Sequence, residues 1–196
     1  MSLYLSRLVI PLDQLLKNGL MNDYKIHQLV YRMCLEPAES RDFLYYVSHT
    51  PYSGVSIIIQ SQRVPKDCDI GRLETKEIPE EFFDFPKYSF LVRIRPVEKN
   101  NGDVVKVLYK TDEVIDWLCS RGPRLGIEFL PETMDKQRGD KISFRNNNKR
   151  TITIAYADIS GILEVKDSAK FRSTVETGIG GNKGFGLGLL QLKPMR

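Results

Sequence analysis

A histidine stands between two tyrosines in the segment NDYKIHQLVYRMCL, residues 22–35, where Tyr24, His27 and Tyr31 are spaced by three and four residues. Residues three and four positions apart share one face of an α-helix, so the three rings would lie together. Histidine transfers protons near neutral pH because its ordinary pKa is about 6.5. A tyrosine, with a pKa of about 10, is a poor base there and is better suited to orienting a reacting group. The spacing therefore predicts a proton-transfer site, and the alternative is a partly buried histidine that hydrogen-bonds a backbone carbonyl.

The helix that would carry these rings is marked by four apolar residues that fall within about 100° of one another: Ile26, Leu29, Val30 and Met33. Asn22 or Asp23 can cap its start, and Pro37 closes its far end. His27 and the two tyrosines then lie on a flank of the buried stripe, next to the core but not inside it. The other histidine, His49, stands in the sequence SHTP, which indicates the end of a strand rather than a catalytic position.

A second feature is the glycine-rich run TGIGGNKGFGLGLL at residues 177–190. Glycine loses much conformational freedom on folding, so such a run implies repeated positive φ angles or the close approach of another group. Lys183 is followed by Gly184, so the hydroxyl residue of a GxxxxGK[ST] phosphate loop is missing, and the order helix, glycines, strand is not that of a dinucleotide-binding fingerprint. We expect a loop with open backbone N–H groups and one cation, Lys183, which can lie against a sugar–phosphate backbone. The alternative is tight packing of a helix against a sheet.

Positive charge is concentrated in the last third of the chain. Residues 136–196 contain twelve Lys and Arg and five Asp and Glu, a net charge of +7, which leaves −3 for residues 1–135. This asymmetry is typical of a polyanion-binding protein, although a solvated basic surface would show it too. Two alternating strands within residues 140–165 flank RNNNKR, which predicts a β-hairpin with a tight turn. That hairpin carries four cations: Lys141, Arg145, Lys149 and Arg150.

The predicted elements form two similar halves. The first half contains a strand at 4–12, a helix at 22–35 and strands at 41–49 and 54–62. The second half contains a strand at 88–99, a helix at 111–122, the hairpin, a helix at 167–178 and a strand at 186–193. The helix at 111–122 begins at the N-cap Thr111 and ends at Gly122. Residues 65–86 predict a short helix or irregular segment. Each half approximates β-α-β-β-α-β, although the second helix and last strand of the first half are weakly marked. We therefore expect an α+β fold of two tandem ferredoxin-like, RRM-like domains, at 1–85 and 86–196.

Composition sets further limits. No apolar run among the 196 residues approaches the roughly 20 needed to cross a bilayer, and the N-terminal segment lacks the features of a signal peptide. The three cysteines, Cys34, Cys68 and Cys119, are far apart, so we expect reduced thiols and a cytoplasmic protein. The sequence has no HExxH motif and no His/Cys cluster, and we expect neither a metal nor a cofactor.

The sequence GIGGNKGFGLGLLQL resembles the C-terminal glycine-rich motif of the RAMP superfamily. It is more closely similar to that of the CasE family, the CRISPR RNA endoribonucleases of type I-E Cascade. The matching motif positions are Gly178, Gly180, Lys183, Gly186, Gly188, Leu189 and Leu190. The opening MSLYLSRLVI, the Tyr-x-x-His of the first helix, RDFLYYV and IIIQSQ are also similar to this family, whereas residues 65–86 match least well.

The resemblance implies a metal-independent cut in the stem-loop repeat of CRISPR precursor RNA. The 2′-hydroxyl would attack the adjacent phosphorus, leaving a 2′,3′-cyclic phosphate and a 5′-hydroxyl. His27 would be general acid or base, and Tyr24 would orient the 2′-hydroxyl or phosphate or share the proton chemistry. The hairpin cations would hold the stem-loop, and Lys183 with the motif glycines would hold the strand near the cut.

The resemblance also implies that the product stays bound to the protein as a Cascade subunit. The partners would then be repeat RNA and other Cascade subunits, with no membrane and no small-molecule cofactor. Two alternatives remain: a non-catalytic RNA-binding RAMP subunit, and an unrelated ferredoxin-like small-molecule regulator. Tyr24 and His27 favour the nuclease over the first alternative, and the basic hairpin argues against the second.

Overall fold

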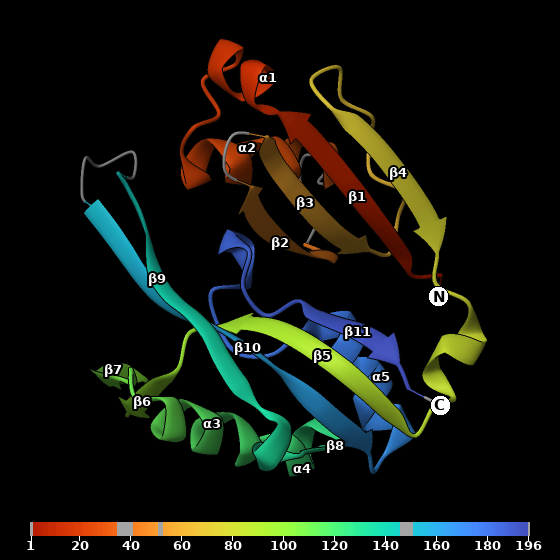
Figure 1. Ribbon diagram of the computed structural model, residues 1–196, viewed down its shortest axis with the longest axis vertical. Coiled ribbons are helices and arrows are strands. Elements are labelled where there is room, and N and C mark those ends of the chain that lie inside the picture. Colours follow the sequence, from red (N-terminus) through yellow and green to blue (C-terminus); the bar gives the residue numbers. More distant parts are fainter. Residues whose placement is uncertain (1, 35–40, 51–52, 146–150, 196) are drawn as a thin grey trace. The chain divides into compact units, whose positions relative to one another are not determined.

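The computed structural model describes residues 2–34, 41–50, 53–145 and 151–195, which form two compact units (Figure 1). The first unit comprises Met1–Pro79 together with two later segments, Ser143–Ile152 and Lys183–Gly186. The second comprises Glu80–Ile142, Thr153–Asn182 and Leu187–Arg196. The chain therefore returns twice to the first unit, which a single boundary between residues 85 and 86 does not describe.

The first unit is built on an antiparallel sheet with the order β2-β3-β1-β4. This is the strand order of a ferredoxin-like domain, and Figure 1 shows it in red to yellow. Its strands are β1 (Tyr4–Pro11), β2 (Phe43–Thr50), β3 (Gly54–Ser61) and β4 (Arg72–Glu77), and its helices are α1 (Leu12–Lys17) and α2 (Asp23–Cys34).

Helix α2 packs its predicted apolar stripe into the core of the first unit. Ile26 and Val30 are fully buried, in one cluster with Leu8 of β1 and Ile57 of β3. Asn22 caps the helix, because its side-chain oxygen accepts a hydrogen bond of 2.8 Å from the backbone N–H of Lys25. The predicted helix is confirmed, and its flank carries half-buried side chains at all three aromatic positions: Tyr24, His27 and Tyr31.

The short helix α1 was not predicted. The described residues 62–71 between β3 and β4 contain no helix; they form an irregular segment with Pro65, one of the two alternatives expected for residues 65–86, which lays Cys68 and Ile70 against the core. Strand β4 does form, although its RLETKE sequence is mostly exposed, because it pairs with β1 from Val9–Arg72 to Tyr4–Glu77.

The second unit has the sheet order β11-β5-β10-β8, and β9 also pairs with β10. This is again the ferredoxin-like order, so the predicted α+β fold of two tandem ferredoxin-like domains is confirmed. The strands are β5 (Lys87–Ile94), β8 (Ile127–Phe129), β9 (Asp135–Arg145), β10 (Thr151–Val165) and β11 (Leu190–Pro194). The helices are α3 (Thr111–Cys119), α4 (Gly122–Leu125) and α5 (Ser168–Thr177), and β6 (Val97–Asn100) pairs with β7 (Asp103–Val107).

Helix α5 leads into the glycine-rich run. The Asp167 carboxylate caps its start by accepting a 3.0 Å bond from the Lys170 N–H, and Gly178 ends it with a φ of 74°. Both helix limits match the sequence pattern. The predicted N-cap of α3 is wrong, since Lys110 occupies that position and Thr111 is the first helical residue.

Strand β5 shows why alternation alone misplaces one residue. In the sequence, Phe90, Val92 and Ile94 alternate with Leu91, Arg93 and Arg95, a period of two that assigns Arg93 to the face opposite the core, but only 6% of Arg93 is exposed. Its guanidinium forms two bonds to the Asp158 carboxylate on β10, at 2.7 and 2.8 Å. A paired charge can be buried where an isolated one cannot, so the ion pair with Asp158 allows Arg93 to be buried.

Candidate active site

His27 contacts the glycine-rich run. Its Nδ1 lies 2.6 Å from the carbonyl oxygen of Gly184, in the short 3₁₀ turn Lys183–Phe185. This turn belongs to the same compact unit as α2, although 157 residues separate the two partners. The structure thus brings together the two features that the sequence marked independently.

The hydrogen bond determines which ring nitrogen of His27 carries the proton. A carbonyl oxygen can only accept, so Nδ1 must donate and is the protonated nitrogen of the neutral ring. Nε2 then holds a lone pair and can take a proton from another molecule. The alternative interpretation of His27, a histidine that hydrogen-bonds a backbone carbonyl, expected such a bond, and the bond is present. It uses only Nδ1, however, so Nε2 can still take part in acid–base chemistry.

Partial burial sets the charge of this ring. Desolvation lowers the pKa of His27 below its usual 6.5, and the hydrogen bond to Gly184 opposes that shift only in part. At neutral pH the imidazole is therefore mostly uncharged. In the absence of substrate, this state suits a general base better than a general acid.

Aromatic rings surround the imidazole. The ring centroid of Tyr31 lies 4.2 Å from that of His27, Phe185 lies at 5.0 Å and Tyr24 at 5.7 Å. Phe185 and Tyr24 are nearly parallel to the imidazole, at 23° and 21°. Both predicted catalytic residues, His27 and Tyr24, thus lie in one cluster, and these contacts restrict the rotation of the histidine ring.

Tyr45 of β2 is a member of this cluster that the sequence pattern did not indicate. Its hydroxyl donates a 2.9 Å hydrogen bond to the Gly184 carbonyl and lies 3.4 Å from Nδ1 of His27. Burial raises the pKa of this phenol far above its usual value of 10, with smaller contributions from Tyr31 and Asp23. The sequence holds only a general indication of its role: a tyrosine in an apolar strand needs a hydrogen-bond partner for its hydroxyl, but the pattern does not say which partner.

The motif glycines adopt the backbone conformation that other residues avoid. Gly178, Gly180, Gly186 and Gly188 have φ angles of 74°, 79°, 79° and 87°. Close approach also occurs, because a Cβ on Gly184 would lie 2.8 Å from the Tyr31 hydroxyl and 3.3 Å from a guanidinium nitrogen of Arg41. Both explanations for the glycine run therefore hold, at different positions.

The expectation of open backbone N–H groups is wrong at three of these glycines. Gly178 donates to the Thr174 carbonyl at 2.7 Å, Gly186 to Lys183 at 3.4 Å and Gly188 to Arg93 at 2.7 Å. The polypeptide itself thus satisfies these amides. These three amides are therefore not open to a ligand, and the glycines serve to shape the loop.

A groove of about 510 Å³ opens beside His27. Seven residues of the α1–α2 connection and of α2 line it: Asn18, Leu20, Lys25, His27, Gln28, Tyr31 and Arg32. Lys25 and Arg32 are exposed, and the groove contains no acidic residue among those described. A groove with two cations, two amides and a tyrosine ring suits a segment of single-stranded nucleic acid.

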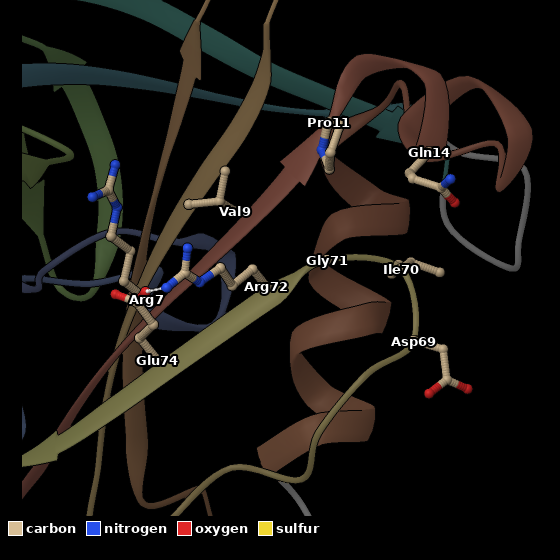
Figure 2. Close-up of a pocket in the computed structure, with 9 residues that line it drawn as sticks. All are labelled: Arg7, Val9, Pro11, Gln14, Asp69, Ile70, Gly71, Arg72 and Glu74. Carbon is tan, nitrogen blue, oxygen red and sulfur yellow. Dashed lines mark ion pairs between the residues drawn. The ribbon is translucent and has the colours of Figure 1, made fainter.

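Another groove of about 510 Å³ lies over β1 and β4 and contains none of the predicted site residues (Figure 2). Its charges are mixed. Arg72 pairs with Glu74 at 2.8 Å, and Asp69 adds a further acidic group. It is less suited to a polyanion than the groove beside His27.

The remaining predicted residues are less fully described. Lys141 is exposed on β9, and β9 and β10 form the predicted hairpin. Lys149 and Arg150 lie outside the described residues, and the position of the Arg145 side chain is not described. His49 is outside the aromatic cluster, with Nε2 3.4 Å from an Asp23 carboxylate oxygen.

The same described ranges contain neither a metal-ion site nor a membrane-spanning helix. No group of three or more His, Cys, Asp and Glu side chains could hold a metal ion there. Within those ranges no helix has both the length and the apolar character needed to span a membrane.

The chain is similar to proteins of CRISPR systems. A family model described as CRISPR associated protein matches residues 3–194. The CRISPR system Cascade subunit CasE of Escherichia coli K12 is 25% identical over 190 residues, which cover 88% of this chain and 92% of that protein.

Solved structures show the same fold at low identity. The CRISPR endoribonuclease Cse3 bound to a 19 nt RNA has a TM-score of 0.84 at 20% identity, with 99% of this chain and 100% of that one covered. Thermus thermophilus Cse3 bound to an RNA representing a pre-cleavage complex has a TM-score of 0.82 at 20% identity and the same coverage. Cas6e of Escherichia coli K-12 has 0.66 at 23% identity, covering 98% and 100%. Since the family model spans nearly the whole sequence, this chain belongs to the CRISPR-associated protein family.

Proposed function

We propose that the protein is a metal-independent endoribonuclease that cuts the stem-loop repeat of CRISPR precursor RNA and retains the product as a Cascade subunit. The observation that carries this proposal is the 2.6 Å bond between His27 Nδ1 and the Gly184 carbonyl, which leaves Nε2 as a base. The relatives support it, because Cse3 is named an endoribonuclease and binds RNA, and CasE is a Cascade subunit.

The reaction begins with the 2′-hydroxyl of the nucleotide before the cut. His27 Nε2 takes its proton, and the 2′-oxygen attacks the adjacent phosphorus in line with the 5′-oxygen. The bond from phosphorus to the 5′-oxygen breaks, and that oxygen takes a proton from solvent water, while the His27 imidazolium releases its proton to solvent. The products are a 2′,3′-cyclic phosphate and a 5′-hydroxyl.

The chain supplies a base, positive charge and an orienting ring for this reaction. The depressed pKa of His27 keeps the base uncharged at neutral pH. Lys25 and Arg32 in the adjacent groove, and Lys183 at the start of the turn, place positive charge where a phosphate would lie. Tyr24, stacked beside the imidazole, is placed to orient the 2′-hydroxyl or the phosphate. We therefore assign catalysis to His27 and orientation to Tyr24.

RNA binding is assigned to the basic hairpin and to the glycine-rich loop. The hairpin cations Lys141, Arg145, Lys149 and Arg150 hold the stem-loop through its phosphates. In the loop, Lys183 contacts the strand, and the motif glycines Gly178, Gly180, Gly186 and Gly188 give the backbone its path. We also propose a cytoplasmic location, supported by three cysteines that form no disulfide: Cys34, Cys68 and Cys119.

The test is cleavage of repeat transcripts in EDTA, with an RNA that carries a single 2′-deoxy nucleotide before the cut as the matched control. We expect the unmodified RNA to yield a 2′,3′-cyclic phosphate and the control to bind without being cut. If the 2′-deoxy RNA were cut, the 2′-hydroxyl would not be the nucleophile. If neither RNA were cut but both bound, the protein would be a non-catalytic RNA-binding subunit.

A further inference from the structure

We propose that Tyr45 is a positioning residue that acts through the Gly184 carbonyl to hold His27 with its proton on Nδ1 and its lone pair on Nε2. This inference rests on the proposed function, because it names a residue that prepares the proposed base. Tyr45 would not touch the RNA, and its effect would reach the reaction through one backbone oxygen.

The Gly184 carbonyl oxygen accepts two hydrogen bonds. The Tyr45 hydroxyl donates one at 2.9 Å, and Nδ1 of His27 donates the other at 2.6 Å. A carbonyl oxygen has two lone pairs, so both donors can be satisfied together. Three segments distant in sequence, α2, β2 and the Lys183–Phe185 turn, thus meet at one atom. Since the tyrosine anchors that atom, it also fixes the acceptor of the histidine proton.

Tyr45 is rigid enough to act as such an anchor. It is 2% exposed, its ring packs near Phe43, and a Cβ on Gly186 would come within 3.0 Å of it. Because burial raises its pKa, the phenol stays protonated through the pH range in which histidine titrates. Tyr45 is therefore a constant donor, and Nε2 of His27 remains the proton-accepting atom.

Removing this hydroxyl would change the imidazole in a defined direction. The Gly184 carbonyl would lose its anchor, so its hydrogen bond with Nδ1 of His27 would weaken. Because that bond raises the pKa of His27, its weakening would lower the pKa further below 6.5, and the ring would be held less strictly in one tautomer. The other titratable or charged groups that face the ring, the turn or the adjoining groove remain in place: Asp23, Tyr24, Lys25, Tyr31, Arg32, Arg41 and Lys183.

The variant is Tyr45→Phe, which keeps the ring and removes only the hydroxyl. Tyr88→Phe is its matched control, because Tyr88 is also fully buried and its hydroxyl also donates to a backbone carbonyl, that of Phe82 in the second unit. Each variant loses one tyrosine-to-carbonyl bond. A general loss of stability should therefore affect both variants, whereas an effect on the imidazole should appear only at Tyr45.

The first readout is the ¹⁵N spectrum of the histidine rings in the RNA-free protein, followed against pH. The chain has two histidines, so a His27→Gln sample assigns the signals. We expect wild type and Tyr88→Phe to show Nδ1 protonated and a pKa below 6.5. Tyr45→Phe should show a still lower pKa and a mixture of the two tautomers. An unchanged tautomer and pKa in Tyr45→Phe would overturn the proposal.

The second readout is single-turnover cleavage. Tyr45→Phe should lower the cleavage rate about tenfold, with unchanged RNA affinity, because the base is misplaced rather than removed. Tyr88→Phe should cleave at the wild-type rate. If His27→Ala is inactive and Tyr45→Phe keeps the wild-type rate and pH profile, the positioning role is refuted while the proposed function stands. If wild type itself does not cleave, the proposed function fails, and the ring spectra still decide the positioning.

Discussion

Gly186 offers a prediction whose size can be worked out from the structure. Its φ is 79°, and a Cβ there would lie 3.0 and 3.4 Å from two carbons of the Tyr45 ring. A left-handed conformation costs a residue with a Cβ roughly 1–2 kcal/mol. The close contact adds to that cost, because the ring of the buried Tyr45 must move by a few tenths of an ångström. Gly186→Ala should therefore lower the free energy of unfolding by about 2 kcal/mol or slightly more.

Two other glycines of the same run separate these contributions. Gly180 has the same φ of 79°, but its nearest neighbour would be a Trp117 ring carbon at 3.8 Å, so Gly180→Ala should cost the conformational part alone, about 1–2 kcal/mol. A Cβ on Gly181 would have no described atom within 4 Å, and the φ of Gly181 is not in the left-handed range. Gly181→Ala should therefore change stability by less than about 0.5 kcal/mol.

The assay is urea unfolding of the three alanine variants, followed by single-turnover cleavage at saturating RNA. We expect the order of stability to be Gly181→Ala, Gly180→Ala and then Gly186→Ala, from most to least stable. Among the three, Gly186→Ala should also show a loss of cleavage rate at full binding, because it displaces Tyr45. If Gly186→Ala were as stable and as active as Gly181→Ala, the described packing of the turn against Tyr45 would be wrong.

Two further predictions concern protons and salt. The cleavage rate should rise with pH and then level off, because deprotonation of His27 creates the base. The midpoint of this rise should lie below pH 6.5, because burial lowers the pKa of His27. A rate that falls above that pKa would indicate that His27 acts as the acid. Lys141→Ala should weaken RNA binding and reduce the slope of log K against log salt by about 0.7–0.9, the value for one phosphate contact; an unchanged slope would show that this exposed residue does not contact the RNA.

The sequence predicted the parts of the site that depend on local pattern. The apolar stripe of α2 placed His27, Tyr24 and Tyr31 on one flank, because helical periodicity alone determines which side chains share a face. The positive φ angles in the glycine-rich run could also be predicted, because glycine is the residue that adopts them at little cost.

What the sequence could not show depends on contacts between distant residues. Tyr45 is 139 residues from its partner Gly184, and no spacing rule connects a strand residue with a turn so far along the chain. Arg93 was misplaced for the same reason, since its burial depends on Asp158, 65 residues away. Strand β4 is polar and mostly exposed, so its place in the sheet comes from pairing with β1 rather than from a hydrophobic pattern.

The central claim is that the His27 imidazole takes the proton from the attacking 2′-hydroxyl, and the most direct measurement compares His27→Ala with wild type on the same repeat RNA. Single-turnover cleavage and RNA affinity should be measured together, with His49→Ala as the control for loss of a histidine outside the site. The account predicts that His27→Ala binds RNA as wild type does and forms no cyclic phosphate, while His49→Ala cleaves normally. Cleavage by His27→Ala at the wild-type rate would contradict it.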